Sequence, residues 1–203
     1  MQALTQLCNR AIWLDKGEIV LDGLSSEVVA RYLQSGYGTG SVREWPDVES
    51  APGDDLVRLR RIRVVQDDED ADAVDVRRPV GLELAFTVLR TGRPVFPKIK
   101  LFDAQGNVAF NAIDTSRRWD DPARTGDYVS TAWIPGNFLN EGVATVVVQI
   151  CSLAAPELYP HLTSDPIAFH VQDPGDGDSA RGRFVGQWKG VVRPLLQWTT
   201  EEG

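Results

Sequence analysis

Residues 98–114, with the sequence KIKLFDAQGNVAFNAID, contain the pattern that decides the fold. Apolar and polar side chains alternate over residues 98–102 and again over residues 108–114, which is the period of a half-buried β-strand. Between them, Gly106 and Asn107 belong to a five-residue segment of turn-forming type. The stretch therefore predicts two antiparallel strands joined by a turn.

The same alternation of apolar and polar residues extends over most of the chain. Short alternating runs are separated by turn residues, and no helical period of useful length lies among them. The predicted strands are Leu56–Val65, Val80–Leu89, Lys98–Phe102, Val108–Asp114, Tyr128–Ile134, Val143–Leu153 and Pro166–Val171. Strands of this length and spacing predict an all-β protein built as an antiparallel β-sandwich.

A smaller unit precedes the predicted sandwich. Residues 11–23 form two strand-like runs around Gly17, which predicts a β-hairpin. Ser25 or Ser26 can cap a short amphipathic helix that ends near residue 35. A stretch rich in glycine, proline and acidic residues follows. We therefore expect a hairpin and helix over 1–35, a linker over 36–55, and the sandwich over 56–203.

Composition excludes several classes of partner. The 203 residues are 42% apolar and carry a net charge of −8, so the chain can bury a core but repels nucleic acids and anionic lipids. Cys8 and Cys151 both lie in apolar runs, where we expect buried thiols in a reducing cytoplasm. We find neither a signal peptide nor an apolar run long enough to span a membrane.

Motifs for catalysis and cofactors are missing from the sequence. There is no phosphate-binding loop and no Gly-x-Ser-x-Gly elbow. The two histidines, His161 and His170, do not provide zinc-site spacing, and the acidic run 67–75 is typical of a solvated loop. We therefore expect no ATP hydrolysis, no catalytic residue, no metal and no cofactor. A pair of carboxylates that meet only in space stays open as a glycosidase alternative.

One segment has the residue types of a carbohydrate-binding surface. Sugars stack on aromatic rings while planar polar side chains bind their hydroxyls. The candidate residues are Asn111, Asp114, Arg117, Arg118, Trp119 and Asp120. The alternative is a polar strand end with Trp119 packed on the core. Tyr159–His161 is a second such cluster, whereas Trp188 and Trp198 are expected to pack.

The C-terminal region predicts an exchangeable strand. Residues 173–179 are rich in glycine and aspartate, and the apolar run 184–192 follows them. A loosely tethered strand can pair with its own sheet or with a neighbour's at similar entropic cost. We therefore expect a homodimer in which residues 183–198 pair with the partner's sheet.

Two parts of the sequence resemble known families. Residues 7–23 (LCNRAIWLDKGEIVLDG) resemble the end of an ABC-transporter ATPase domain, just past its switch histidine. Residues 133–142 (WIPGNFLNEG) and 188–194 (WKGVVRP) resemble the C-terminal domain of Wzt-type ATP-binding subunits of polysaccharide exporters. The order of these parts is itself fairly specific.

The resemblance implies an immunoglobulin-like sandwich that binds O-antigen-type polysaccharide, often at a modified non-reducing end, during lipopolysaccharide biosynthesis. It also implies a cytoplasmic location at the inner face of the inner membrane, a membrane-subunit partner, exchange of the terminal strand, and ATPase activity in a full-length parent only. The alternatives are a dimerisation or interaction module without glycan binding, and a carbohydrate-modifying enzyme.

Overall fold

The computed structural model describes residues 8–15, 17–25, 28, 40–115, 121–154, 156–186 and 188–202. Its strands are β1 (Arg10–Asp15), β2 (Glu18–Leu24), β3 (Val42–Glu44), β4 (Val57–Gln66), β5 (Glu69–Asp70), β6 (Ala73–Asp75), β7 (Val80–Val88), β8 (Phe96–Phe102), β9 (Val108–Ile113), β10 (Gly126–Ile134), β11 (Gly142–Ala154), β12 (Glu157–Thr163) and β13 (Ile167–Gln172). No helix among these residues is both long and apolar enough to cross a membrane.

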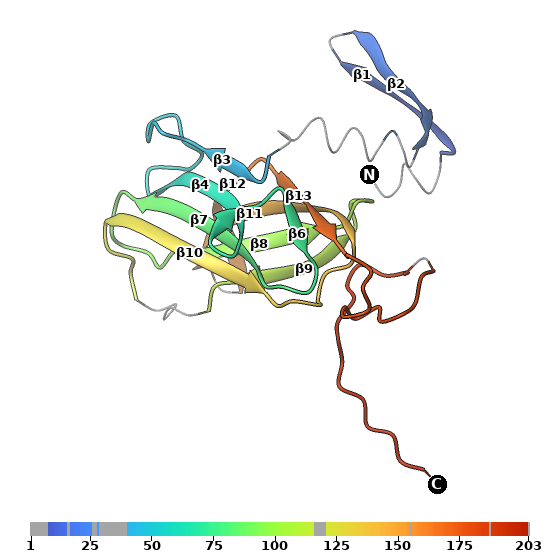
Figure 1. Ribbon diagram of the computed structural model, residues 1–203. Coiled ribbons are helices and arrows are strands. Elements are labelled where there is room, and N and C mark those ends of the chain that lie inside the picture. Colours follow the sequence, from blue (N-terminus) through green and yellow to red (C-terminus); the bar gives the residue numbers. More distant parts are fainter. Residues whose placement is uncertain are drawn as a thin grey trace.

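Two sheets form the body of the molecule (Figure 1). The five-stranded sheet has the order β10-β7-β4-β3, with β5 also paired to β4. The six-stranded sheet has the order β6-β13-β11-β8-β9, with β12 paired to the second half of β11. All pairs are antiparallel except β13 with β6. The all-β, immunoglobulin-like sandwich predicted from the sequence is confirmed.

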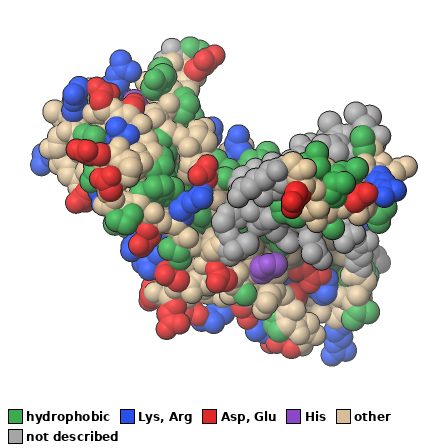
Figure 2. Space-filling model, turned by 90° about the horizontal axis from the view of Figure 1, so that it is seen from above, with side chains coloured by type: hydrophobic (Ala, Val, Ile, Leu, Met, Phe, Trp, Pro, Cys, Tyr) green, Lys and Arg blue, Asp and Glu red, His purple; other side chains and the backbone are tan. Residues whose placement is uncertain are grey.

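The core lies between the two sheets and follows from the alternation of the strands. In β7 and β11 the inward residues, such as Leu82 and Val146, are fully buried, whereas the residues that follow them, Glu83 and Val147, are partly exposed. A side chain of this size contributes about 1.5–3 kcal/mol when it is buried. In Figure 2 acidic and basic side chains are interspersed over the outer surface.

The seven predicted strands correspond to β4, β7, β8, β9, β10, β11 and β13. The short strands β3, β5, β6 and β12 were not predicted. Pro160 breaks the strand signal of β12, and the structure accommodates it opposite Cys151, at a register shift between Ile150 and Cys151. β3 lies inside the expected 36–55 linker and pairs with β4.

The N-terminal hairpin is present as β1 and β2, which stand apart from the sandwich in Figure 1. The predicted helix lies outside the described residues except for Ser25 and Val28. Cys151 is buried, which raises the pKa of its thiol, whereas Cys8 is exposed, contrary to expectation. Cys8 directly precedes the hairpin, whose two strands pair only with each other.

The prediction of a strand over residues 184–192 is wrong. The described residues of this run form no strand, and Val192 makes one isolated bridge to Leu139. Within this run Gly190 has a φ of 117°, a positive value that interrupts an extended strand. The segment instead follows the surface and is anchored through Arg193.

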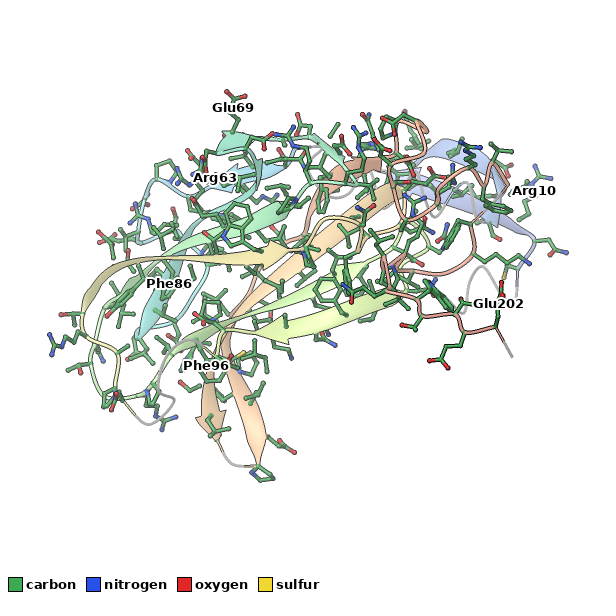
Figure 3. The ribbon with its side chains drawn as sticks, turned by 60° about the horizontal axis from the view of Figure 1, so that its bottom comes forward. Arg10, Arg63, Glu69, Phe86, Phe96 and Glu202 are labelled. Carbon is green, nitrogen blue, oxygen red and sulfur yellow. The ribbon has the colours of Figure 1, made fainter. Side chains whose placement is uncertain are left out.

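The strand directions give the sandwich two distinct ends. Turn 53–56, loop 89–95 and residues 114, 115 and 121–125 lie at one end, named here the loop end. Turn 103–107, loop 135–141 and segment 173–195 lie at the other, named here the tail end. In Figure 3 the β11–β12 hairpin projects beyond the sandwich near Phe96, at the loop end.

Candidate functional site

Two of the six residues predicted to bind carbohydrate, Asn111 and Asp114, lie in the described structure. Asn111 lies on β9 with an exposed side chain. Asp114 comes directly after that strand and is partly buried, and its backbone N–H donates to the Pro97 carbonyl at 2.9 Å. Arg117, Arg118, Trp119 and Asp120 lie outside the described residues, so their site roles stay predictions.

A cleft of about 530 Å³ opens beside Asp114, and we name it the edge cleft. It lies between the edge strands β9 and β10, where the two sheets separate. Leu84 and Ile99 contribute buried apolar surface to its lining, and Thr115, Ser130 and Thr131 contribute hydroxyl groups. Asp114 adds a carboxylate at one side. Apolar surface beside hydroxyl and carboxylate groups is suited to a sugar ring.

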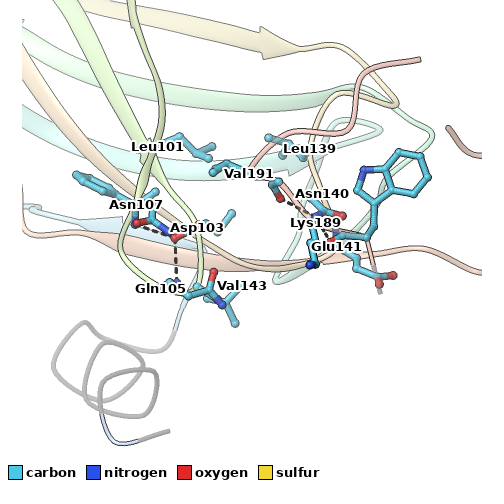
Figure 4. Close-up of a pocket in the computed structure, with 15 residues that line it drawn as sticks. Leu101, Asp103, Gln105, Asn107, Leu139, Asn140, Glu141, Val143, Lys189 and Val191 are labelled. Carbon is cyan, nitrogen blue, oxygen red and sulfur yellow. Dashed lines mark hydrogen bonds between the residues drawn. The ribbon is translucent and has the colours of Figure 1, made fainter. Parts of the chain in front are cut away.

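A second cleft, of about 520 Å³, lies at the tail end (Figure 4). Turn 103–107, loop 139–143 and segment 188–191 line it. Its polar groups largely bind one another: Asn140 Nδ2 donates to the Gly190 carbonyl at 2.8 Å, and Asn107 Nδ2 donates to Asp103 at 2.7 Å. These contacts hold the surrounding loops together and leave few polar groups for a ligand.

The tail end also contains a fully buried ion pair. Arg193 Nη2 lies 2.6 Å from Asp173 Oδ2, and both side chains have no exposed surface. Burial raises the pKa of Asp173, but hydrogen bonds from Ser179, the Gly175 backbone and Arg193 outweigh it, and the pKa falls below its ordinary value. The Arg193 guanidinium also lies over the Trp188 ring, 5.8 Å from its centroid, so Trp188 packs as expected. The same expectation is wrong for Trp198, whose side chain is 86% exposed.

At the loop end, three side chains from distant parts of the sequence form a hydrogen-bonded chain. His161 Nδ1 lies 2.7 Å from Asp54 Oδ2, and His161 Nε2 lies 2.7 Å from Ser152 Oγ. Burial raises the pKa of Asp54, but the hydrogen bonds from His161 and from two backbone N–H groups outweigh it and lower the pKa. Sequence analysis singled out His161 but missed Asp54 and Ser152.

This order of Asp, His and Ser resembles the triad of serine hydrolases, but the geometry supports a structural role. The Ser152 side chain is buried, and its hydroxyl donates to the Pro94 carbonyl at 2.7 Å. A nucleophilic hydroxyl must instead face an open site and give its proton to the histidine. The chain of hydrogen bonds therefore ties loop 89–95 to β11, β12 and turn 53–56.

Three carboxylates of the acidic run 67–75 pair with arginines. Asp70 pairs with Arg63, Asp67 pairs with Arg78, and Asp75 accepts hydrogen bonds from the backbone N–H and the guanidinium of Arg77. Arg63 also binds Glu83 on the neighbouring strand β7. These carboxylates form a surface ion-pair network at the sheet edge.

Comparisons with known proteins were made by sequence and by structure. No protein-family model matches the chain. An uncharacterised ABC transporter ATP-binding protein of Methanocaldococcus jannaschii is 33% identical over 63 residues, which are 30% of this chain and 11% of that protein. The chain thus spans about a tenth of the length of this curated relative.

The crystal structure of the C-terminal domain of Wzt superposes with a TM-score of 0.58 and 15% identity, and the match covers 84% of this chain and 94% of that domain. A CARDB domain from Pyrococcus furiosus gives a TM-score of 0.33, which is too low to support an inference. The chain therefore has the fold of the C-terminal domain of Wzt and also resembles, over 63 residues, an ABC transporter ATP-binding protein.

Proposed function

We propose that the chain is a non-catalytic carbohydrate-binding module of an ABC exporter, which recognises O-antigen-type polysaccharide at its non-reducing end. Residues 1–35 are then the end of an ATPase domain, residues 36–55 are a connecting segment, and the remainder is the recognition domain. In this proposal the module works in the cytoplasm, at the inner face of the inner membrane, with the exporter's membrane subunit as partner.

The edge cleft is the observation that carries this proposal. It combines apolar surface from Leu84 and Ile99 with the Ser130 and Thr131 side chains. It also begins at Asp114, where the chain enters the segment with the predicted sugar-binding residues. A groove between edge strands can accommodate an extended polymer, and apolar and polar surfaces in one cleft match the two faces of a pyranose ring.

Titration against polysaccharide purified from the organism that encodes the chain tests the proposal. Wild-type protein should bind in calorimetry, and Trp119→Ala should cost about 1–3 kcal/mol of affinity, as for one well-used aromatic anchor. Trp133→Ala is a matched control, because Trp133 is an exposed tryptophan at the tail end of β10. Absence of binding by wild type, or equal binding by Trp119→Ala, would contradict the proposal.

We also propose that the module is a homodimer. Leu195, Leu196 and Trp198 are 64%, 59% and 86% exposed on the extended C-terminal segment, which an interaction with a second copy would cover. The backbone of Arg193 and Leu195 bonds to loop 135–141 of the same chain. In an exchanged dimer the partner would supply these bonds.

Sedimentation distinguishes the dimer from the monomer. The intact chain should sediment as a dimer, and a chain that ends at Ser179 should sediment as a monomer. A chain that ends at Leu195 keeps the Arg193 anchor and lacks only the projecting tail. Its sedimentation shows whether dimerisation needs the tail or only the segment before it. A monomeric intact chain would overturn the proposed dimer, and a fully dimeric chain ending at Ser179 would overturn the exchange.

A further inference from the structure

A third cleft, of about 420 Å³, lies at the loop end and contains Tyr159 and His161 of the second predicted cluster. Turn 53–56, loop 89–95 and β12 supply its lining, and we name it the Tyr159 cleft. Ala123 N–H donates to the Arg93 carbonyl at 3.3 Å, so the cleft borders Ala123. The Tyr159 cleft lies on the β12 side of the sandwich, whereas the edge cleft lies between β9 and β10.

The aromatic ring of this cleft is held in one orientation. Tyr159 is 52% exposed, and its ring packs edge-on against His161 with 5.1 Å between centroids. The His161 ring is itself fixed, because its two nitrogens face Asp54 and Ser152 at 2.7 Å each. A preorganised ring loses little conformational entropy when a ligand stacks on it.

The polar groups around the ring suit a polyol of no net charge. Arg90 and Arg93 provide guanidinium donors, and Asp55 provides a carboxylate acceptor. Asp54 is the second carboxylate, so two cationic and two anionic side chains line the cleft. The Arg90 and Asp55 side chains are each more than two-thirds exposed, so both can bind hydroxyl groups of a ligand.

We propose that the Tyr159 cleft is a second sugar-binding subsite, which takes one neutral pyranose ring stacked on Tyr159. This inference rests on the proposed function and extends it: the glycan that the module recognises makes a second contact at Tyr159. His161 and Asp54 act as positioning residues, which hold the tyrosine and loop 89–95 in place.

Simple methyl glycosides are the probes for this subsite. We expect methyl glucoside, galactoside or mannoside to shift the backbone NMR signals of Thr91, Gly92 and Tyr159 at millimolar concentration, as expected for one ring. Tyr159→Ala should raise the dissociation constant about tenfold through loss of stacking, and Tyr159→Phe should stay within about twofold because the ring remains. Phe184→Ala is the matched control, since Phe184 is 51% exposed at the tail end.

The outcomes separate this proposal from the broader one. Methyl glycosides that shift no signal of the cleft, or that bind Tyr159→Ala as tightly as wild type, would overturn the subsite. Tighter binding of methyl glucuronide than of the neutral glycosides would overturn the assignment to an uncharged sugar. If the purified polysaccharide binds wild type and Tyr159→Ala equally, the subsite is wrong while the proposed function stands. If wild type does not bind the polysaccharide, the proposed function fails.

Discussion

The two ends of the sandwich use buried polar groups in different ways. At the tail end, Arg193 and Asp173 are completely excluded from water and anchor the C-terminal segment. At the loop end, the Asp54 side chain keeps 33% of its surface exposed, and its partner His161 borders an open cleft. Complete burial makes the first pair a structural anchor, whereas partial exposure lets the second orient groups that a ligand can reach.

The largest effect is expected from breaking the tail-end pair. Arg193→Met leaves Asp173 as a buried carboxylate without its cationic partner, which should lower the free energy of unfolding by about 3–5 kcal/mol. Urea denaturation followed by tryptophan fluorescence measures this loss. Proteolysis should also become faster within residues 188–202, because the segment loses its anchor. A variant as stable as wild type would show that the pair is not an anchor.

A smaller loss is expected at the loop end. His161→Ala removes the partner of Asp54 Oδ2, but this carboxylate is partly exposed and water can replace the bond. We expect a loss of about 1–3 kcal/mol in the free energy of unfolding. Tyr159→Ala is the control, since it removes an exposed neighbour and should cost less than about 0.5 kcal/mol. If both variants lost the same free energy of unfolding, His161 could not be distinguished as a positioning residue from Tyr159 as a ligand-contacting residue.

Acid should weaken both ends over the same pH range. The pKa values of Asp54 and Asp173 lie below the ordinary value of 3.8, so the unfolded chain takes up protons first as the pH falls. Their contribution is therefore complete above about pH 5 and is lost as the pH falls through 3.8 toward their native pKa values. In urea denaturation between pH 7 and pH 3, Asp54→Asn should show a shallower decline than wild type. An equally steep decline would contradict this assignment.

The smallest effect is expected from the exposed pair at the rim of the Tyr159 cleft. Arg90 and Asp55 are 69% and 73% exposed, so water already solvates both charges. Arg90→Met should change the free energy of unfolding by less than about 0.5 kcal/mol. The same denaturation experiment measures it, and a loss as large as that of His161→Ala would mean that the rim is structural.

The fold could be predicted because its signals are local. Alternation over residues 80–89 and 143–153 identified strands, and Gly106 and Asn107 marked a turn, without knowledge of the strand order. β3 and β6 were missed because each has only three residues, too few for a period to be recognised. The run 184–192 has the composition of a strand, yet its path is decided by an anchor outside it, at Arg193.

The candidate sites could be predicted only in part. Asn111 and Asp114 are close in the sequence, so the local residue types were enough to group them as candidates. The roles of Arg117–Asp120, which follow them, stay predictions. Asp54 and His161 are 107 positions apart, and no pattern in the sequence relates them. Tyr159 and His161 were recognised as a cluster, but their partners Asp54, Ser152 and Arg93 come from three other segments.

The sequence by itself determined which segments are strands, which of their faces are apolar and where the chain turns, because backbone preference and side-chain alternation act over a few residues. Only the tertiary structure decided which loops share an end of the sandwich and which charges are removed from water. Those properties depend on the order of strands in two sheets, so residues more than a hundred positions apart become hydrogen-bonded neighbours. Burial of Arg193 depends in the same way on loop 135–141 and on Asp173, which the fold brings to the returning chain, and not on its own sequence neighbours.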